Sequence, residues 1–360
     1  MIYLDYATTA PIKQVAFQAI KDAPFANPNS LHRWGLLAKA TLTGAENLVK
    51  LHINGHNGRI VWLSTASLAN AFVIKSILDL PYYSPDTFIC METAHKSIRN
   101  FGHEDTMLFP LESGLISSEE LENITYTTKL VSMLYVNNET GVIQPVNEIK
   151  SRIKNALYHV DAVQAAGKLP IDVERMQCDF LTMSGHKFGT PKGIACLWIR
   201  NNIEIELPYL GTPQVPMASA FAKTLASCDL TQWKCDMVEK EIFFKQCLAS
   251  SAKKSQISYN YNTDTSKRLP GLLSIGFKGI DASELVMRLS DRGLAVSSGS
   301  ACNSIDIVPS PVLTAMGIST KDALSSIRIS LSPENTESEL KKGVTILTNT
   351  VRDMYHEAEY

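Results

Sequence analysis

The residues best able to do chemistry in this chain stand where apolar segments end. Ser184, His186 and Lys187 follow the apolar stretch 180–183 and precede a second one at 194–199. Other apolar stretches are followed in the same way by polar side chains, namely Ser67, His95, Asn138, Asp161 and Gln164. Sites in open α/β sheets form beyond the carboxyl ends of the strands. We therefore expect these groups to converge on one rim.

This set of groups suits pyridoxal 5′-phosphate (PLP). PLP needs a lysine amine to bond its aldehyde and an acid beside its ring nitrogen. We predict that Lys187 supplies the amine and Asp161 the acid, while His95 stacks on the ring. Asn138 and Gln164 would reach the phenolic oxygen of the cofactor. Lys187 and His95 are then the catalytic candidates among these residues.

The phosphate of the cofactor is expected at the start of a helix. Ala66 and Ser67 open a helix-like segment, and the free N–H groups and positive dipole end of a helix N-terminus bind anions. Ser184 and His186 would complete this phosphate site. Each residue has an ordinary explanation when taken alone, such as a helix cap or a solvated surface side chain. The prediction depends on their occurrence together at successive strand ends.

Short apolar runs that alternate with helix-like segments must position these residues. Several runs are apolar at nearly every position, which is typical of strands covered on both faces. Helix-like stretches lie between them, including 66–78 and 146–154. The alternation predicts an α/β fold with a mostly parallel sheet and helices on both faces. Strands are expected at 60–64, 87–92, 130–136, 157–162, 180–184 and 194–199.

The chain changes character after about residue 250. The stretch 258–271 is polar and rich in turn residues, with little periodicity. Thr336-x-x-Glu339 is a capping-box pattern that would open a long terminal helix. We predict a large cofactor-binding α/β domain over residues 13–249. A smaller α+β domain would combine residues 1–12 and 250–360.

Composition disfavours several other classes of protein. The 360 residues carry a net charge of −2, which gives no reason to expect direct binding to nucleic acid or an anionic membrane. Neither a signal peptide nor a membrane-spanning apolar run is apparent. The seven cysteines are odd in number and form no C-x-x-C pair, which disfavours both a disulfide framework and a cysteine zinc site. We expect a cytoplasmic protein without a metal site.

Seven motifs resemble, in order, those of the cysteine desulfurases within the class V group of PLP-dependent aminotransferases. Together they extend over most of the chain. The resemblance implies PLP-dependent transferase fold type I. The motifs are "NPNSLHRWG" (27–35), "ETAHKS" (92–97), "VNNETGVIQP" (136–145), "YHVDAVQAAGKLPID" (158–172), "SGHKFGTPKG" (184–193), "SSGSACNS" (297–304) and "SSIRISL" (325–331).

The resemblance also implies an activity. Such an enzyme converts L-cysteine to L-alanine and leaves a persulfide on a catalytic cysteine, here Cys302. Arg328 and Asn27 would bind the substrate carboxylate, although a helix cap or turn is an equal alternative for Asn27. The stretch 302–309 resembles the longer-loop branch, which implies direct sulfur transfer to an iron–sulfur scaffold or a tRNA-thiolation enzyme. Two alternatives stay open: another class V PLP lyase or aminotransferase such as selenocysteine lyase, and a degenerate scaffold without catalysis.

The sequence departs from the family pattern in two places. Thr65 stands where the family has glycine and Leu68 where it has an acid. Because glycine often serves a conformation that threonine tolerates poorly, we expect an altered phosphate loop. A glycine-rich stretch is also shortened, to 210–216. In family homodimers this stretch lends a threonine to the partner's phosphate site, so Thr212 is the candidate and a homodimer with an altered contact is expected.

Overall fold

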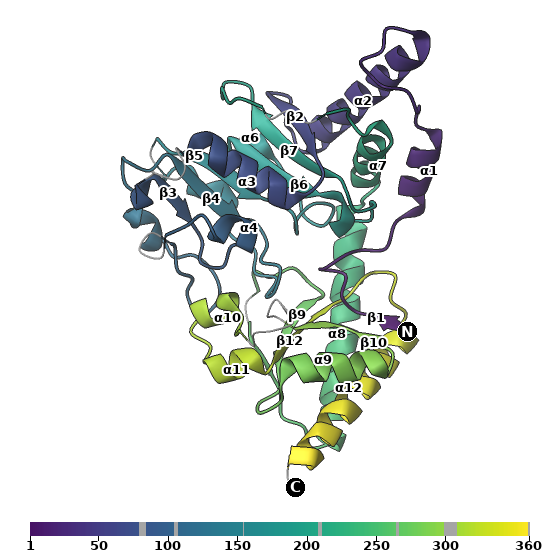
Figure 1. The fold of residues 1–360 in the computed structure, drawn as a ribbon. Helices are drawn as coiled ribbons and strands as arrows, with labels where there is room; N and C mark the ends of the chain where they lie inside the picture. Colours follow the sequence, from purple (N-terminus) through teal and green to yellow (C-terminus); the bar gives the residue numbers. More distant parts are fainter. Residues whose placement is uncertain are drawn as a thin grey trace.

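The structure, a computed structural model, describes residues 1–78, 84–103, 107–153, 155–207, 211–263, 266–298 and 308–358. Figure 1 shows two lobes, with α8 (Leu230–Lys254) running between them. None of the helices in these ranges has an apolar stretch long enough to cross a membrane.

The first lobe is built on a large, mostly parallel sheet, as predicted. Within the described residues its strand order is β2-β7-β6-β5-β4-β3, and neighbouring strands from β3 to β6 are parallel. β7 runs antiparallel to both neighbours because the connection from β6 is too short for a parallel crossover. The strands are β2 (Gly58–Leu63), β3 (Phe88–Cys90), β4 (Leu130–Leu134), β5 (Leu157–Asp161), β6 (Phe180–Ser184) and β7 (Ala195–Arg200).

Helices pack around this sheet. α3 contacts β6 and β7, whereas α2 contacts β2 and also packs, like α1, against α7. The predicted helix at 146–154 is wrong in length, since α5 ends at Ile149 and turns follow. The helices are α1 (Gln14–Asp22), α2 (Arg33–His52), α3 (Ala66–Ile77), α4 (Lys96–Arg99), α5 (Val146–Ile149), α6 (Val173–Met176) and α7 (Val215–Ala226), with 3-10 turns η1 (Pro85–Thr87), η3 (Glu120–Asn123) and η4 (Gly185–Lys187).

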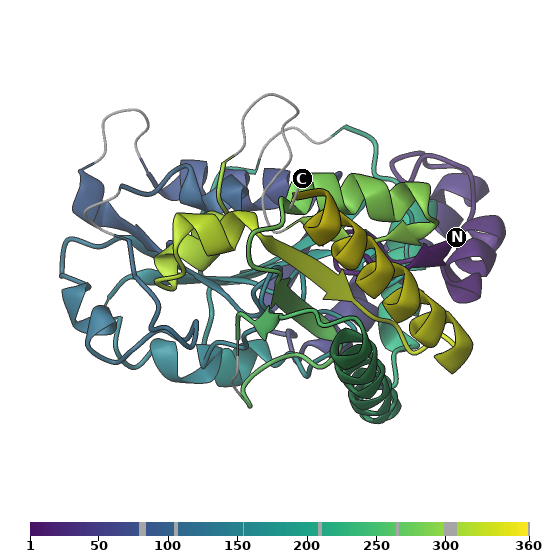
Figure 2. The same ribbon diagram turned by 90° about the horizontal axis from the view of Figure 1, so that it is seen from below.

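The second lobe has a smaller sheet and a core of its own. α12 packs against α8 and α9 (Figure 2), and apolar side chains from all three helices meet Ile2 and Leu4 in this core. The predicted capping box is present at the start of α12, since Thr336 Oγ1 accepts from the Glu339 N–H at 3.2 Å and Glu339 Oε2 accepts from the Thr336 N–H at 2.9 Å. The sheet order is β11-β12-β9-β8, beside the parallel pair β1-β10. The elements are β1 (Ile2–Tyr3), β8 (Asn260–Tyr261), β9 (Leu272–Gly276), β10 (Leu294–Ala295), β11 (Ser297–Ser298), β12 (Ser326–Ser330), α9 (Ala282–Asp291), α10 (Pro311–Ala315), α11 (Thr320–Leu324) and α12 (Glu337–Ala358).

The N-terminal segment (residues 1–13) crosses from the second lobe to the first. β1 pairs with β10, and the Ala7 N–H donates to Ser330 Oγ at 2.9 Å. Further along, the Ala10 N–H donates to the His186 carbonyl at 2.8 Å and the Lys13 N–H donates to the Gly189 carbonyl at 2.9 Å. This segment therefore lies directly beside the residues that follow β6.

Candidate active site

A cavity of about 540 Å³ lies where the carboxyl ends of β2, β4, β5 and β6 meet the N-terminal segment. Cys302 lies outside the described residues, and Asn27 and Thr212 do not line the cavity. The structure brings the other predicted site residues together in its walls: Ala66, Ser67, His95, Asn138, Asp161, Gln164, Ser184, His186, Lys187 and Arg328.

Asp161, the last residue of β5, provides a buried carboxylate. Its Oδ1 accepts from the Val163 N–H at 3.0 Å and its Oδ2 from Asn70 Nδ2 at 3.0 Å. Burial raises the pKa of this carboxyl, while these two hydrogen bonds and the nearby His95 and Lys187 act in the opposite direction. A protonated ring nitrogen placed against it would add a further charge that favours the ionised form.

Lys187 follows β6 at the end of the turn η4. Its Nζ donates to the carbonyls of Ala7 at 2.8 Å and Thr8 at 2.9 Å. Burial, followed by the charge of Arg328, lowers the pKa of the amine to about 8. A substantial fraction is therefore unprotonated near neutral pH, which is the form that attacks an aldehyde.

His95 caps α4 and is held in one orientation. Its Nδ1 accepts from the Ser97 N–H at 3.2 Å and lies 2.8 Å from Ser97 Oγ. Burial lowers the pKa of the imidazole, so the neutral ring is favoured, and its remaining proton is assigned to Nε2. Asn70 connects this residue to the carboxylate, since its Nδ2 also donates to Ser97 Oγ at 3.1 Å.

The start of α3, where the phosphate site is predicted, lies in the wall of the cavity. Thr65, which stands where the family has glycine, has the extended angles φ −145° and ψ 151° that any residue adopts. Thr65 caps α3, because its Oγ1 accepts from the Leu68 N–H at 3.2 Å. The N–H groups of Ala66 and Ser67 have no acceptor in the described chain, so they are available to an anion.

His186 lines the same cavity as that helix start. Its Nδ1 lies 3.2 Å from Thr9 Oγ1. Burial, followed by the nearby lysines, lowers the pKa of His186 to about 4. His186 is therefore neutral at physiological pH and can serve the phosphate as a hydrogen-bond donor rather than as a cation.

Arg328, in the middle of β12, is oriented by the N-terminal segment and the loop after β4. Nη1 donates to the Asn138 carbonyl at 3.0 Å, and Nη2 donates to Asp5 Oδ1 at 2.7 Å. Nε is buried and has no hydrogen-bond partner among the described residues. A guanidinium with an unused buried donor suits the carboxylate of an amino acid.

The structure places two predicted residues elsewhere. Asn27 is exposed, and its Oδ1 accepts from the Asn29 N–H at 2.9 Å, which is the turn alternative given above. Thr212 is exposed and precedes α7. Neither side chain faces the cavity of its own chain.

Some site residues escaped the sequence analysis. Asn70 offered a signal, because a polar residue occupies a buried position of the apolar helix α3. Asp5 and Thr8 offered none, since they follow only the very short apolar stretch 2–4 and reach the site only through the N-terminal segment. Lys168, whose Nζ donates to Gln164 Oε1 at 3.2 Å, is a further residue of this kind.

The donor set fits PLP. It combines an amine with a lowered pKa, a buried carboxylate, a fixed imidazole and a helix start with free N–H groups. Lys187 would bond the aldehyde, Asp161 would face the ring nitrogen, and Ala66 and Ser67 would hold the phosphate. All of these residues already line the same cavity in the described chain, so none of them has to move to it from elsewhere.

Known proteins agree with this assignment. The family model "Aminotransferase class-V" matches residues 2–210 and 207–342. The cysteine desulfurase IscS of Shewanella baltica is 35% identical over 376 residues, covering 97% of this chain and 92% of that protein. Among solved structures, a NifS-like protein has a TM-score of 0.83 at 26% identity and covers 99% of both chains. A structure of SspA in complex with cysteine has a TM-score of 0.79 at 28% identity, covering 93% of this chain and 100% of that one.

The chain therefore belongs to the class V aminotransferase family, and its fold is that of the PLP-dependent enzymes of fold type I. Within that family it groups with the cysteine desulfurases, and its cofactor is PLP.

Proposed function

We propose that the enzyme converts L-cysteine to L-alanine and passes the sulfur first to Cys302 as a persulfide. The observation that carries this proposal is the single cavity in which Lys187, Asp161 and Arg328 meet. The names of the relatives support the reaction, and the SspA structure in complex with cysteine supports the substrate.

The residues of the cavity divide the work. When bound, PLP supplies an electron sink for the pair left at the substrate Cα. Arg328, which lines the cavity, holds the substrate carboxylate. The amine of Lys187, with its pKa near 8, can move the Cα proton at physiological pH. Asp161 keeps the ring nitrogen protonated.

Sulfur transfer requires a thiolate. Cys302 Sγ would form a bond to the substrate sulfur while the Cβ–S bond breaks, and Cβ keeps that electron pair and takes up one proton to become the methyl group of alanine. The described residues on either side of Cys302 lie beside the site. Ser297 pairs with Arg328 across β11 and β12, and Ser310 Oγ donates to Glu139, the neighbour of Asn138.

The test uses the holoenzyme with L-cysteine, quantifies alanine and locates the persulfide by mass spectrometry. Cys302→Ala should abolish the persulfide and reduce alanine formation at least a hundredfold. Cys235→Ala is the matched control, because Cys235 is an exposed free cysteine of α8. Undiminished alanine and persulfide formation in Cys302→Ala would rule out the proposed role of Cys302.

We also propose that the enzyme is a homodimer. Large apolar side chains are exposed together on the α1–α2 part of the first lobe, with Leu31 92% and Phe25 86% exposed. Phe17, Trp34 and Leu37 are exposed on the same two helices. Large apolar side chains that are exposed together in this way are typical of an interface. In such a dimer Thr212 would reach the phosphate site of the partner subunit.

The sulfur acceptor is proposed as a partner protein, either an iron–sulfur scaffold or a tRNA-thiolation enzyme. This proposal rests on the family resemblance of the stretch that contains Cys302. The cytoplasmic location expected from the cysteine pattern stays a prediction.

A further inference from the structure

Gln164 and Lys168 are four residues apart on one tight turn. The Ala162 carbonyl accepts from the N–H groups of Ala165 at 3.0 Å and Ala166 at 2.9 Å, and the Lys168 N–H donates to the Ala165 carbonyl at 3.0 Å. Gly167 adopts φ +73°, and a Cβ there would meet Phe188 Cβ at 2.8 Å, so the close turn requires glycine.

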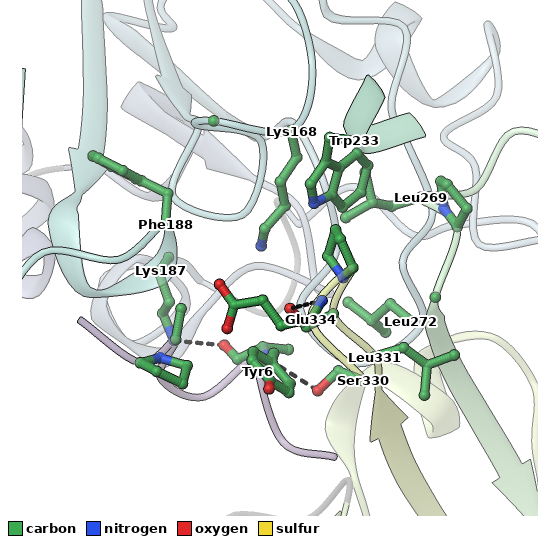
Figure 3. A pocket seen from close by; sticks show the side chains of 18 of the residues that line it. Tyr6, Lys168, Lys187, Phe188, Trp233, Leu269, Leu272, Ser330, Leu331 and Glu334 are labelled. Carbon is green, nitrogen blue, oxygen red and sulfur yellow. Dashed lines mark hydrogen bonds between the residues drawn. The ribbon is translucent and has the colours of Figure 1, made fainter. Parts of the chain in front are cut away.

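The side chain of Lys168 extends into a second, smaller cavity of about 170 Å³ (Figure 3), which shares Ala7 and Lys187 with the catalytic cavity. Its Nζ donates to Gln164 Oε1 at 3.2 Å. No carboxylate of the described residues forms an ion pair with it. Burial, followed by the charges of Lys187 and Arg328, lowers the pKa of this amine to about 7. Placing an amine here has a free-energy cost that no ion pair offsets.

The hydrogen bonds of Gln164 define which end of its amide faces which partner. The Lys168 amine donates to Gln164 Oε1, which can only accept, so this bond fixes the position of Oε1. Nε2 donates one N–H to the Ala7 carbonyl at 2.8 Å. Nε2 has a second N–H, and Gln164 lines the catalytic cavity. Without Lys168, only the Ala7 carbonyl would distinguish the two ends of the amide, which are nearly equivalent in shape.

We propose that Lys168 is a positioning residue that fixes the amide of Gln164, so that an N–H of Nε2 faces the phenolic oxygen of PLP. The proposal rests on the function above, because it concerns the binding of that cofactor. Lys168 itself touches neither cofactor nor substrate. Its effect on the reaction passes through Gln164.

The experiment measures the Kd of PLP and the visible absorption spectrum of the holo form in variants of the full chain. Lys168→Met should raise the Kd about tenfold, the effect of leaving a buried polar group unpaired, and should shift the absorption maximum. Lys168→Arg, which keeps a donor and a charge, should stay within threefold of the parent. Lys13→Met is the matched control, because Lys13 lines the same small cavity but makes no bond to Gln164.

A double-mutant cycle separates positioning from charge. If Lys168 acts through Gln164, then Gln164→Ala combined with Lys168→Met should bind PLP no more than about threefold more weakly than Gln164→Ala alone. Additive effects, equal effects of Lys13→Met and Lys168→Met, or an unchanged Kd and spectrum in Lys168→Met would each overturn the proposal. A purely structural role would lower the Tm without moving the spectrum, which also overturns it.

Two further outcomes are distinguishable from these. If Lys168→Met does not fold, Lys168→Ala removes the same donor and carries the same expectations and the same contrary outcomes. If the parent enzyme itself binds no PLP, the proposed function fails together with this inference. If the parent binds PLP and the Lys168 variant binds it equally well, this inference is refuted and the proposed function is not.

Discussion

At the scale of single residues, the site is governed by the removal of charged groups from water. Burial lowers the pKa of Lys187 and Lys168 and raises the pKa of Asp161. His186 and His95 are shifted toward the neutral form by the same cause. PLP and the substrate therefore bring negative charges into a cavity in which few charged protein groups are already paired with one another. Binding of these anions then favours the protonated forms of the lysines.

The lowered pKa of Lys168 has a measurable effect on folding stability. The folded chain releases this proton near pH 7, whereas the unfolded chain holds it to about 10.5. The unfolded state therefore binds more protons between these values, and the cost of burying the amine, which is full below pH 7, disappears as pH rises toward 10.5. Methionine has no such cost. Lys168→Met should exceed the parent in stability most at pH 7.

Urea denaturation of the apo proteins at pH 7 and pH 9.5 checks this expectation. The difference in free energy of unfolding between Lys168→Met and the parent should be smaller at the higher pH. Lys187, Arg328, Lys13 and Cys228 are the charged or titratable groups that act on Lys168, and they are common to both proteins. A difference that stays constant or grows with pH would contradict the assigned shift.

The sequence was most informative about residues that directly follow a strand. Asp161 and Lys187 could be predicted because each ends or follows an apolar run whose strand fixes its position. Asp5 could not be predicted, because its contact with Arg328 joins residues that are 323 positions apart. The conformation of Thr65 could not be decided from the sequence for a different reason. A glycine in relatives does not by itself mean that a positive φ is required.

At the scale of elements, one buried hydrogen bond joins α10 to the loop after β4, the loop that contains Asn138 and Glu139. Ser310 caps α10 by accepting from the Leu313 N–H at 3.2 Å, and its Oγ donates to Glu139 Oε2 at 2.5 Å. Burial raises the pKa of Glu139 to about 7. The described chain resumes at residue 308, so this bond fixes the first element after the part that contains Cys302.

Ser310→Ala should cost about 2–3 kcal/mol of folding free energy, the sum of a lost helix cap and a buried carboxyl left without its donor. Ser319→Ala is the control, because Ser319 caps α11 in the same way but is exposed and does not contact Glu139. It should cost about 1 kcal/mol. Chemical denaturation at pH 8 measures both values, and equal losses would show that the bond to Glu139 adds nothing.

Helices and strands could be predicted where the local sequence pattern determines their structure. They could not be predicted where pairing with residues far along the chain determines it. The six strands of the large sheet follow apolar runs, and the terminal helix follows its capping box. The reversed direction of β7 is a matter of connection length rather than of local pattern. β1 and β10 are only two residues long, too short to leave a periodic signal, and they form by pairing with each other.

At the scale of the whole molecule, the exposed apolar surface of the first lobe lies away from the second lobe. α1 and α2 stand at the far end of the first lobe in Figure 1. A dimer formed through this surface would leave the second lobe, with the ends of the chain segment that contains Cys302, accessible to a sulfur acceptor.

Leu31→Asp should therefore convert a dimer into a monomer, because it places a charge in the centre of the proposed interface. Light scattering after size-exclusion chromatography measures the mass. Met287→Asp is the control, since Met287 is also exposed, at 62%, but belongs to α9 of the second lobe. A monomeric parent enzyme, or a dimer that survives Leu31→Asp, would exclude this interface.

The N-terminal segment also determines when the enzyme can become complete during its synthesis. Residues 2 and 3 leave the ribosome long before their strand partners, residues 294 and 295, and the Ala7 N–H bonds Ser330. The carbonyls that hold Lys187 lie in this same segment. A nascent chain thus cannot close its coenzyme site until residues 294 to 330 have also been synthesised.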